Sequence, residues 1–152
     1  MLSPSFALRE FLRSQTAARM GREIVPSEAD VENLRRLCQS LLQPIRDHLG
    51  RAIAISSGLR PAWLNTAIGG AANSAHLTGR AVDCTAVGMS AEMFARWIQR
   101  NGYRPDKCIL EFPESSSGGW VHLQIGRPGQ ENRGEFLVAR RVGGRTVYEV
   151  MT

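Results

Sequence analysis

Two histidines and an aspartate are the residues of this chain whose types and spacing most clearly suggest chemistry. His76 and Asp83 stand in the run Ser-Ala-His-Leu-Thr-Gly-Arg-Ala-Val-Asp, and His122 follows far downstream in Trp-Val-His. A neutral imidazole and a carboxylate bind zinc at similar distances, and three protein ligands leave the fourth position of a tetrahedral ion open. The set therefore predicts a catalytic site for one zinc ion.

These segments resemble the M15 family of zinc peptidases, which includes D-Ala-D-Ala carboxypeptidases and phage L-alanyl-D-glutamate endopeptidases. Upstream of the histidines, residues 55–60 (Ile-Ser-Ser-Gly-Leu-Arg) are similar to the Ser-Gly-Tyr-Arg segment of that family. The opening residues 2–17 resemble its phage-type members. The likeness covers residues 2–126 and extends to the loop residues Asn65, Gly69, Gly70 and Asn73.

The resemblance implies a fold, a metal and a substrate. The fold would be that of hedgehog proteins and D-Ala-D-Ala peptidases, and one zinc ion would be held by His76, Asp83 and His122. The substrate would be the stem peptide of peptidoglycan, cleaved by a carboxypeptidase or an endopeptidase in phage- or prophage-related lysis of the cell wall. Cleavage of L-Ala-D-Glu, of D-Ala-D-Ala or of a cross-bridge remains open.

Amide hydrolysis also needs a general base. Many M15 members carry a Glu or Asp three residues before the last histidine, but this chain has Gly119 there. Glu111, among apolar neighbours, is the expected replacement, either as the base or as a partner that holds His122 in one tautomer. Glu114 is the alternative base.

The expected position of Glu111 depends on a hairpin. Residues 107–112 and 120–125 are predicted to be strands, joined by a connection rich in Ser and Gly. If the hairpin is centred between Ser116 and Ser117, Glu111 lies directly opposite His122, with the two Cβ atoms about 5 Å apart on one face. The carboxylate would then point toward the metal.

Three further residues are candidates for contact with the substrate. Arg60 matches the family arginine near the substrate, where a guanidinium could bind a peptide carboxylate or stabilise the oxyanion during catalysis. Ser74, two residues before His76, could bind the substrate or shape its loop. Trp120 shares a face with His122 by strand alternation and could line the cleft or pack.

The order of elements predicts an α+β fold in which N-terminal helices pack on a small antiparallel sheet. Pro44 should bend the second helix, and Gly143-Gly144 suits a hairpin turn. Residues 58–80 are expected to form a long functional loop. The expected helices are 7–18, 27–49 and 91–101, and the expected strands are 52–56, 80–85, 107–112, 120–125, 135–140 and 145–150.

Length and composition fit one domain spanning residues 1–152. No apolar run approaches the about 20 residues of a membrane helix, and charged residues interrupt any signal-peptide pattern near the N-terminus. We therefore expect synthesis in the cytoplasm, no membrane insertion, and access to the wall by phage-type release or as part of a particle.

The charge and the cysteines narrow the function further. The net charge of +5 suits an anionic wall, while scattered arginines without an aromatic platform argue against nucleic-acid binding. No Cys-x-x-Cys pair suggests a thiolate metal site. We expect buried free thiols at Cys38, Cys84 and Cys108.

Two other functions fit the same residues. The first is a noncatalytic zinc module that binds the wall or belongs to a phage tail, which Gly119 in place of an acid would favour. The second is a metal-independent wall glycosidase that uses Glu111 or Glu114 as its acid. A zinc-dependent peptidase is the interpretation that uses all of the motif residues.

Overall fold

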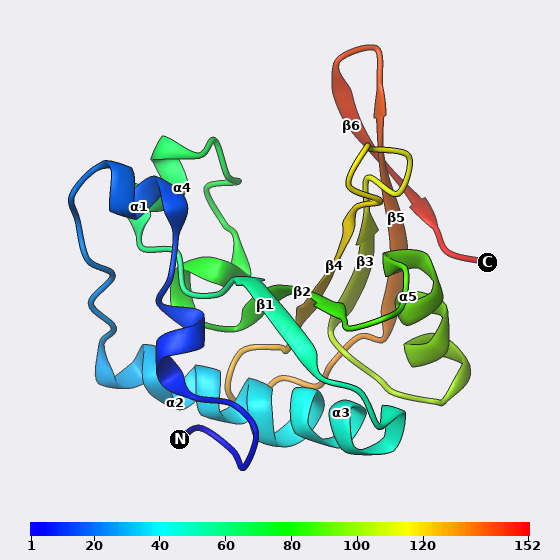
Figure 1. Ribbon diagram of the computed structural model, residues 1–152, viewed down its shortest axis with the longest axis horizontal. Helices are drawn as coiled ribbons and strands as arrows, with labels where there is room; N and C mark the ends of the chain where they lie inside the picture. The colour runs from blue at the N-terminus through cyan, green and yellow to red at the C-terminus, as the bar shows by residue number, and fades with distance from the viewer.

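A six-stranded sheet forms the scaffold of the protein in the computed structural model, which describes residues 1–152 (Figure 1). Its strands lie in the spatial order β1-β2-β4-β3-β5-β6. The strands are β1 (Ile53–Ser57), β2 (Ala81–Ala86), β3 (Lys107–Glu111), β4 (Trp120–Gln124), β5 (Glu135–Val142) and β6 (Arg145–Val150). The fold is α+β, as the sequence predicts.

The sheet is mixed, so the expectation of an antiparallel sheet is wrong at one pairing. β3 pairs antiparallel with β4 on one side and parallel with β5 on the other. β2 occupies the second edge of β4, and β5 takes the free edge of β3. The connection through residues 125–134 starts at the end of the sheet where β4 finishes and β3 begins, so β5 runs in the direction of β3.

The helices lie mostly in the N-terminal half, and α2 and α3 run along the bottom of the view in Figure 1. No helix is long and apolar enough to cross a bilayer. The helices are α1 (Gln15–Arg19), α2 (Glu28–Leu37), α3 (Gln43–Leu49), α4 (Ala62–Ala67) and α5 (Ala91–Arg100), with 3-10 turns η1 (Leu8–Phe11) and η3 (Ala75–Thr78) and a π-helical segment η2 (Cys38–Leu42).

Two expected segments are divided differently in the structure. The helix expected over residues 7–18 is two short helices, because Ser14 is extended and its hydroxyl accepts a hydrogen bond from the Ala17 N–H, which starts α1. Residues 58–80 are not a structureless loop, since they contain α4 and η3.

The helix expected over residues 27–49 forms in three continuous parts. Ser27 and Asp30 make the expected capping box at its start. Pro44 lacks an N–H group, and the π-helical turn η2 immediately before it accommodates the missing hydrogen bond, with the Gln43 N–H donating to the Cys38 carbonyl.

One face of the sheet belongs to the core and the other to a cleft. On β4, Val121 and Leu123 are fully buried in the same apolar cluster as residues of α2, α3 and α5. Trp120, His122 and Gln124 point the other way and line the cleft. This alternation follows from the period of two in a strand.

The β5–β6 hairpin projects from the top of the molecule in Figure 1. Val142 pairs with Arg145 across a turn formed by Gly143 and Gly144, whose φ angles are 56° and 77°. Positive φ at both central residues is what a type I′ turn requires, so the expected hairpin is confirmed. All six residues of β6 are exposed.

Candidate metal centre

His76, Asp83 and His122 come together as a buried cluster on the cleft face of the sheet. Their potential ligand atoms all lie within 4.8 Å of one another. Asp83 Oδ1 is 3.2 Å from His76 Nε2 and 3.2 Å from His122 Nδ1. Asp83 pairs directly with His122 across β2 and β4, while η3 supplies His76.

The donor set fits a zinc ion. Ligands about 2.1 Å from a tetrahedral ion are about 3.4 Å from one another, close to the two 3.2 Å separations in the cluster. Two imidazoles and one carboxylate are also donor types that zinc accepts. The residues present could therefore hold zinc and leave a fourth position free.

The backbone fixes the orientation of His76. Its Nδ1 lies 2.8 Å from the Gly58 carbonyl oxygen. A carbonyl only accepts hydrogen bonds, so the neutral ring carries its proton on Nδ1 and presents the Nε2 lone pair to the cluster. Burial lowers the pKa of His76, against the charge of Asp83, which favours the neutral form that a metal needs.

Asp83 and His122 shift each other's pKa in opposite directions. Burial acts to raise the pKa of Asp83, but the two neighbouring imidazoles hold it well below its ordinary value. Burial acts to lower the pKa of His122, but the hydrogen bond and the charge of Asp83 raise it. The cluster thus offers an ionised carboxylate between two imidazoles.

Glu111 faces the cluster, although in a different register from the expected one. Glu111 pairs with Trp120, and Ile109 lies opposite His122. The expected register is therefore wrong by two residues, because Phe112 adopts a left-handed φ of 50° and Gly118 and Gly119 form the turn with positive φ. A shift of two residues keeps the face, and Glu111 Oε1 lies 3.9 Å from His122 Nδ1.

The surroundings of Glu111 raise the pKa of its carboxyl group above the value that a glutamate has in water. Burial and the charge of Asp83 raise its pKa to about 7, while His122 and Arg60 oppose the shift. A carboxyl group with such a pKa can accept or release a proton at neutral pH.

Gly119 occupies the position at which many M15 members carry an acid, and the structure leaves no room for one. A Cβ atom there would stand 2.1 Å from the Glu111 carbonyl oxygen and 2.8 Å from that of Phe112. The turn that places Glu111 on the cleft face therefore requires glycine at this position.

Arg60 and Ser74 hold the loop of His76. The backbone N–H of Arg60 donates to the His76 carbonyl. Ser74 Oγ accepts from the His76 N–H at 3.2 Å and from Arg60 Nη2 at 3.4 Å. Ser74 thus shapes the loop, while the buried Arg60 Nε has no hydrogen-bond partner and the side chain lines the cleft.

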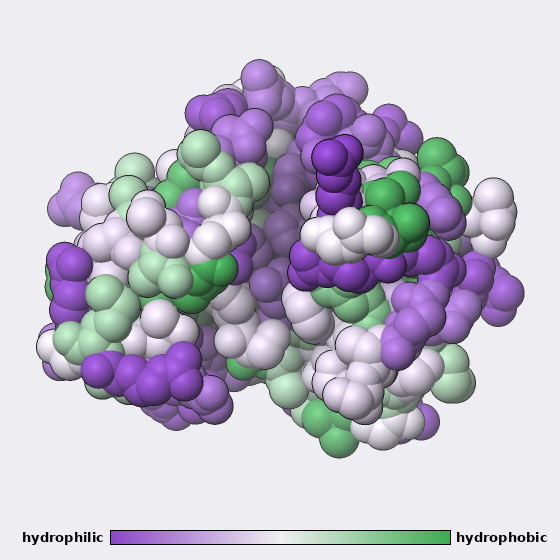
Figure 2. All heavy atoms as spheres, turned by 90° about the horizontal axis from the view of Figure 1, so that it is seen from above, coloured by the Kyte–Doolittle hydropathy of each residue, from purple (hydrophilic) through white to green (hydrophobic).

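The cleft has a volume of about 980 Å³ and runs along β3 and β4. Figure 2 shows it as a hollow with hydrophilic residues at its bottom, between two lobes. Its walls come from residues 68–76, residues 126–133 and β6. The floor consists of alternate residues of the two strands, namely Lys107, Ile109, Glu111, Trp120, His122 and Gln124.

Other candidate residues lie elsewhere. Glu114 is exposed in the β3–β4 connection and pairs with Arg140, so it does not face the cluster. His48, the remaining histidine of the chain, lies in α3 and contacts Tyr103. The three cysteines are buried and free, as expected, and burial raises the pKa of Cys38 to about 12.

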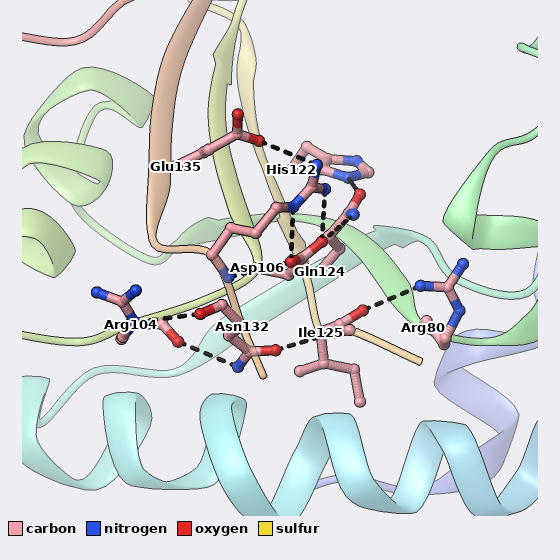
Figure 3. Close-up of polar contacts among 10 residues, drawn as sticks. Arg80, Arg104, Asp106, His122, Gln124, Ile125, Asn132 and Glu135 are labelled. Carbon is pink, nitrogen blue, oxygen red and sulfur yellow. Dashed lines mark hydrogen bonds and ion pairs between the residues drawn. The ribbon is translucent and has the colours of Figure 1, made fainter. Parts of the chain in front are cut away.

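Sequence reasoning missed the partners on the far side of His122. His122 Nε2 lies 2.9 Å from Gln124 Oε1, and Gln124 Nε2 donates to Asp106 at 2.7 Å (Figure 3). Strand alternation could have placed Gln124 beside His122. Asp106 lies just before β3, and no local pattern marks it.

The comparison with family models agrees with the geometry. The model for Peptidase M15 matches residues 4–124 of the 152, a range that includes the cluster, Arg60 and Glu111. No curated protein matches the chain. The resemblance noted from the motifs is thus confirmed over most of the chain. A buried His–Asp–His cluster on the floor of a cleft, within a match of this length, identifies the chain as a member of the peptidase M15 family, whose members act on peptide substrates.

Proposed function

We propose that this chain is a zinc-dependent peptidase that hydrolyses amide bonds in peptidoglycan stem peptides. The observation that carries the proposal is the half-buried carboxyl of Glu111 beside the His76–Asp83–His122 cluster, on the floor of a cleft. Membership of the M15 family supports peptide substrates. The resemblance of the motifs to wall peptidases and the net charge of +5 support the anionic wall.

The cluster would hold zinc through His76 Nε2, Asp83 Oδ1 and His122 Nδ1. Zinc bound there would polarise the scissile carbonyl and acidify a water molecule. The chain's own contribution is to orient both imidazoles and to keep the Asp83 carboxylate ionised through its contacts with them.

Glu111 would act as the general base. Its Oε1 atom, 3.9 Å from His122 Nδ1, would accept a proton from the attacking water and pass it to the nitrogen of the departing amine. A pKa of about 7 suits both transfers. Positioned acid–base groups contribute about 10²–10⁴-fold to the rate.

Arg60 would stabilise negative charge on the substrate. Its guanidinium lines the cleft and has a buried Nε without a partner. A donor held in this way can bind the oxyanion of the tetrahedral intermediate or a peptide carboxylate. Trp120 lines the floor beside Glu111, where its ring would contact the peptide.

The course of the cleft favours cleavage within a peptide. Its floor extends from Glu111 and Trp120 past the cluster to Lys107 and Gln124. A five-residue strand spans about 14 Å along its axis, so a peptide could continue on both sides of the cleaved bond. We therefore favour an endopeptidase over a carboxypeptidase. Access to the wall by phage-type release or within a particle stays a prediction.

Mass spectrometry of purified peptidoglycan tests this function directly. The wall material is digested with the protein, with and without a zinc chelator. A new peptide terminus that is lost on chelation and restored by zinc supports the peptidase and names the bond. Walls of several chemotypes that yield no new terminus, although the protein binds zinc, would contradict it.

Glu111→Gln separates the peptidase from the noncatalytic zinc module that the glycine at position 119 favours. The amide keeps the shape of the side chain but cannot accept the proton. We expect activity to fall by about 10²–10⁴-fold with zinc still bound at one equivalent, measured by metal analysis of the purified variant. Unchanged activity would remove Glu111 from the reaction.

A further inference from the structure

A row of side chains leads away from the cluster behind His122 (Figure 3). His122 Nε2 contacts Gln124 Oε1 at 2.9 Å, and Gln124 Nε2 contacts Asp106 Oδ2 at 2.7 Å. Arg133 closes the row with two side-chain bonds to Asp106, from Nε to Oδ1 at 3.0 Å and from Nη2 to Oδ2 at 2.8 Å.

The chemistry at the far end sets the direction of every hydrogen bond in the row. A guanidinium only donates and an ionised carboxylate only accepts, so Asp106 must receive a proton from Gln124. The atom of Gln124 that faces Asp106 is therefore its NH₂ group, and the atom that faces His122 is its carbonyl oxygen. That oxygen can only accept, so the row favours a proton on His122 Nε2, whereas the Asp83 carboxylate, 3.2 Å from Nδ1, favours a proton on Nδ1 as long as no cation lies between them.

The Asp106 carboxylate is held in place by enough hydrogen bonds to fix these donor and acceptor directions. Asp106 is 5% exposed. Its two oxygens accept four hydrogen bonds, of which the fourth comes from the backbone N–H of Arg133 at 3.1 Å. A backbone hydrogen bond also joins the two middle members of the row, because the Asp106 N–H donates to the Gln124 carbonyl at 2.8 Å.

We propose that Gln124, Asp106 and Arg133 are positioning residues that favour the Nε2–H tautomer of His122 over the Nδ1–H tautomer that Asp83 favours, and so leave the Nδ1 lone pair free for the candidate metal site. The statement about the tautomer concerns the protein alone. The statement that this tautomer strengthens metal binding rests on the proposed function.

The two histidines of the cluster are thus fixed by different means. His76 donates to a backbone carbonyl, that of Gly58, which no substitution of a side chain removes. His122 depends on a glutamine, whose amide group can turn around. Partners of this kind behind a ligand histidine alter metal affinity by about 10–100-fold when they are removed.

Gln124→Met tests the row, with Gln99→Met as the matched control. Both glutamines are half-buried, but Gln99 lies on α5 and donates only to the Met151 carbonyl. Long-range nitrogen–proton NMR on the metal-free proteins, at a pH where all imidazoles are neutral, reads the tautomer of each histidine. Competition with a chelator then measures zinc affinity.

Asp106→Asn provides a second test, because it should reverse the amide of Gln124 and with it the tautomer of His122. Arg133 still only donates, so the asparagine must turn its oxygen toward Arg133 and its NH₂ toward Gln124. Gln124 would then reverse its amide and donate to His122 Nε2, which moves the imidazole proton to Nδ1. A merely structural role for Asp106 predicts no such inversion.

We expect the share of the Nε2–H tautomer at His122 to be highest in the unsubstituted protein and to fall in Gln124→Met and further in Asp106→Asn, with zinc affinity lowered about 10–100-fold in both variants. Gln99→Met should change neither quantity. A share of the Nε2–H tautomer that is the same in the unsubstituted protein and in both variants would overturn the proposal. If the tautomers follow the prediction but the protein neither binds zinc nor cleaves peptide, the positioning role stands and the proposed function fails.

Discussion

Gly119→Ala tests whether the β3–β4 turn forces the acid of this site onto Glu111. The added Cβ would stand 2.1 Å from the Glu111 carbonyl oxygen, and the backbone of Gly119 has a φ of 77°. The atom in the way is backbone, so no side chain can rotate to make room. The strand or the turn itself must move.

Gly118→Ala is a control with the same backbone strain, but its added Cβ would contact no other atom. Gly118 has a φ of 79°, but no atom lies within 4 Å of the place where its Cβ would be. An alanine there should cost about 1–2 kcal/mol for the left-handed backbone alone. At Gly119 the same cost is joined by about 1–3 kcal/mol for displaced packing. We therefore expect a loss of about 2–5 kcal/mol at Gly119.

Urea unfolding of both variants measures the two losses under the same conditions. Gly119→Ala should be the less stable variant by about 1–3 kcal/mol, and it should also lose peptidase activity because the backbone of Glu111 moves. Equal losses in the two variants would refute the close approach. Gly119→Glu, which restores the acid found in many M15 members, should be at least as unstable and no more active.

Three further predictions follow from the contacts of other residues. Arg60→Met should lower kcat/KM by about 10²–10³-fold without releasing zinc, and steady-state kinetics on a defined stem peptide checks it. Hydrogen bonds from Arg133 hold the pKa of Asp106 at about 2, below the ordinary value of about 3.9. The paired carboxylate therefore stabilises the fold above about pH 4, and this stabilisation disappears as the pH falls to about 2. Because the Arg133 side chain is 54% exposed, we expect a contribution of only about 1–2 kcal/mol, seen as a stability gap to Asp106→Asn that closes in acid. Burial raises the pKa of every cysteine thiol, so a thiol reagent should label none in the folded protein and all three after unfolding, namely Cys38, Cys84 and Cys108.

The cluster could be predicted from the sequence because its residues lie in short runs with recognisable spacing. The face of Glu111 could be predicted for a different reason. Side chains alternate with a period of two, so an error of two residues in the register left the carboxyl beside His122. The register itself depended on the backbone of Phe112, whose left-handed φ of 50° has no signal in its residue type.

The missed features depend on contacts between distant segments. The parallel pairing of β3 with β5 depends on which free edge of the sheet β5 takes, and a sequence read segment by segment does not contain that information. Asp106 acquires its role only when the connection before β5 brings Arg133 against it. Local patterns predicted the residues of the cluster, but not the side chains that hold the imidazole of His122 in position.

The alternation of β4 between core and cleft also limits how this site can change during evolution. Inserting one residue into the strand would turn Val121 and Leu123 into the cleft and drive the imidazole of His122 into the apolar core. The floor of the cleft therefore tolerates substitution but not a change of length. Much of the walls consists of connecting segments and an exposed edge strand, β6, which can lengthen or shorten without disturbing the core. The parts that carry Ser74, His76 and Arg133 are fixed by their hydrogen bonds. New substrate preferences in this lineage should thus arise by insertions and deletions in the walls, while the length of the floor stays constant.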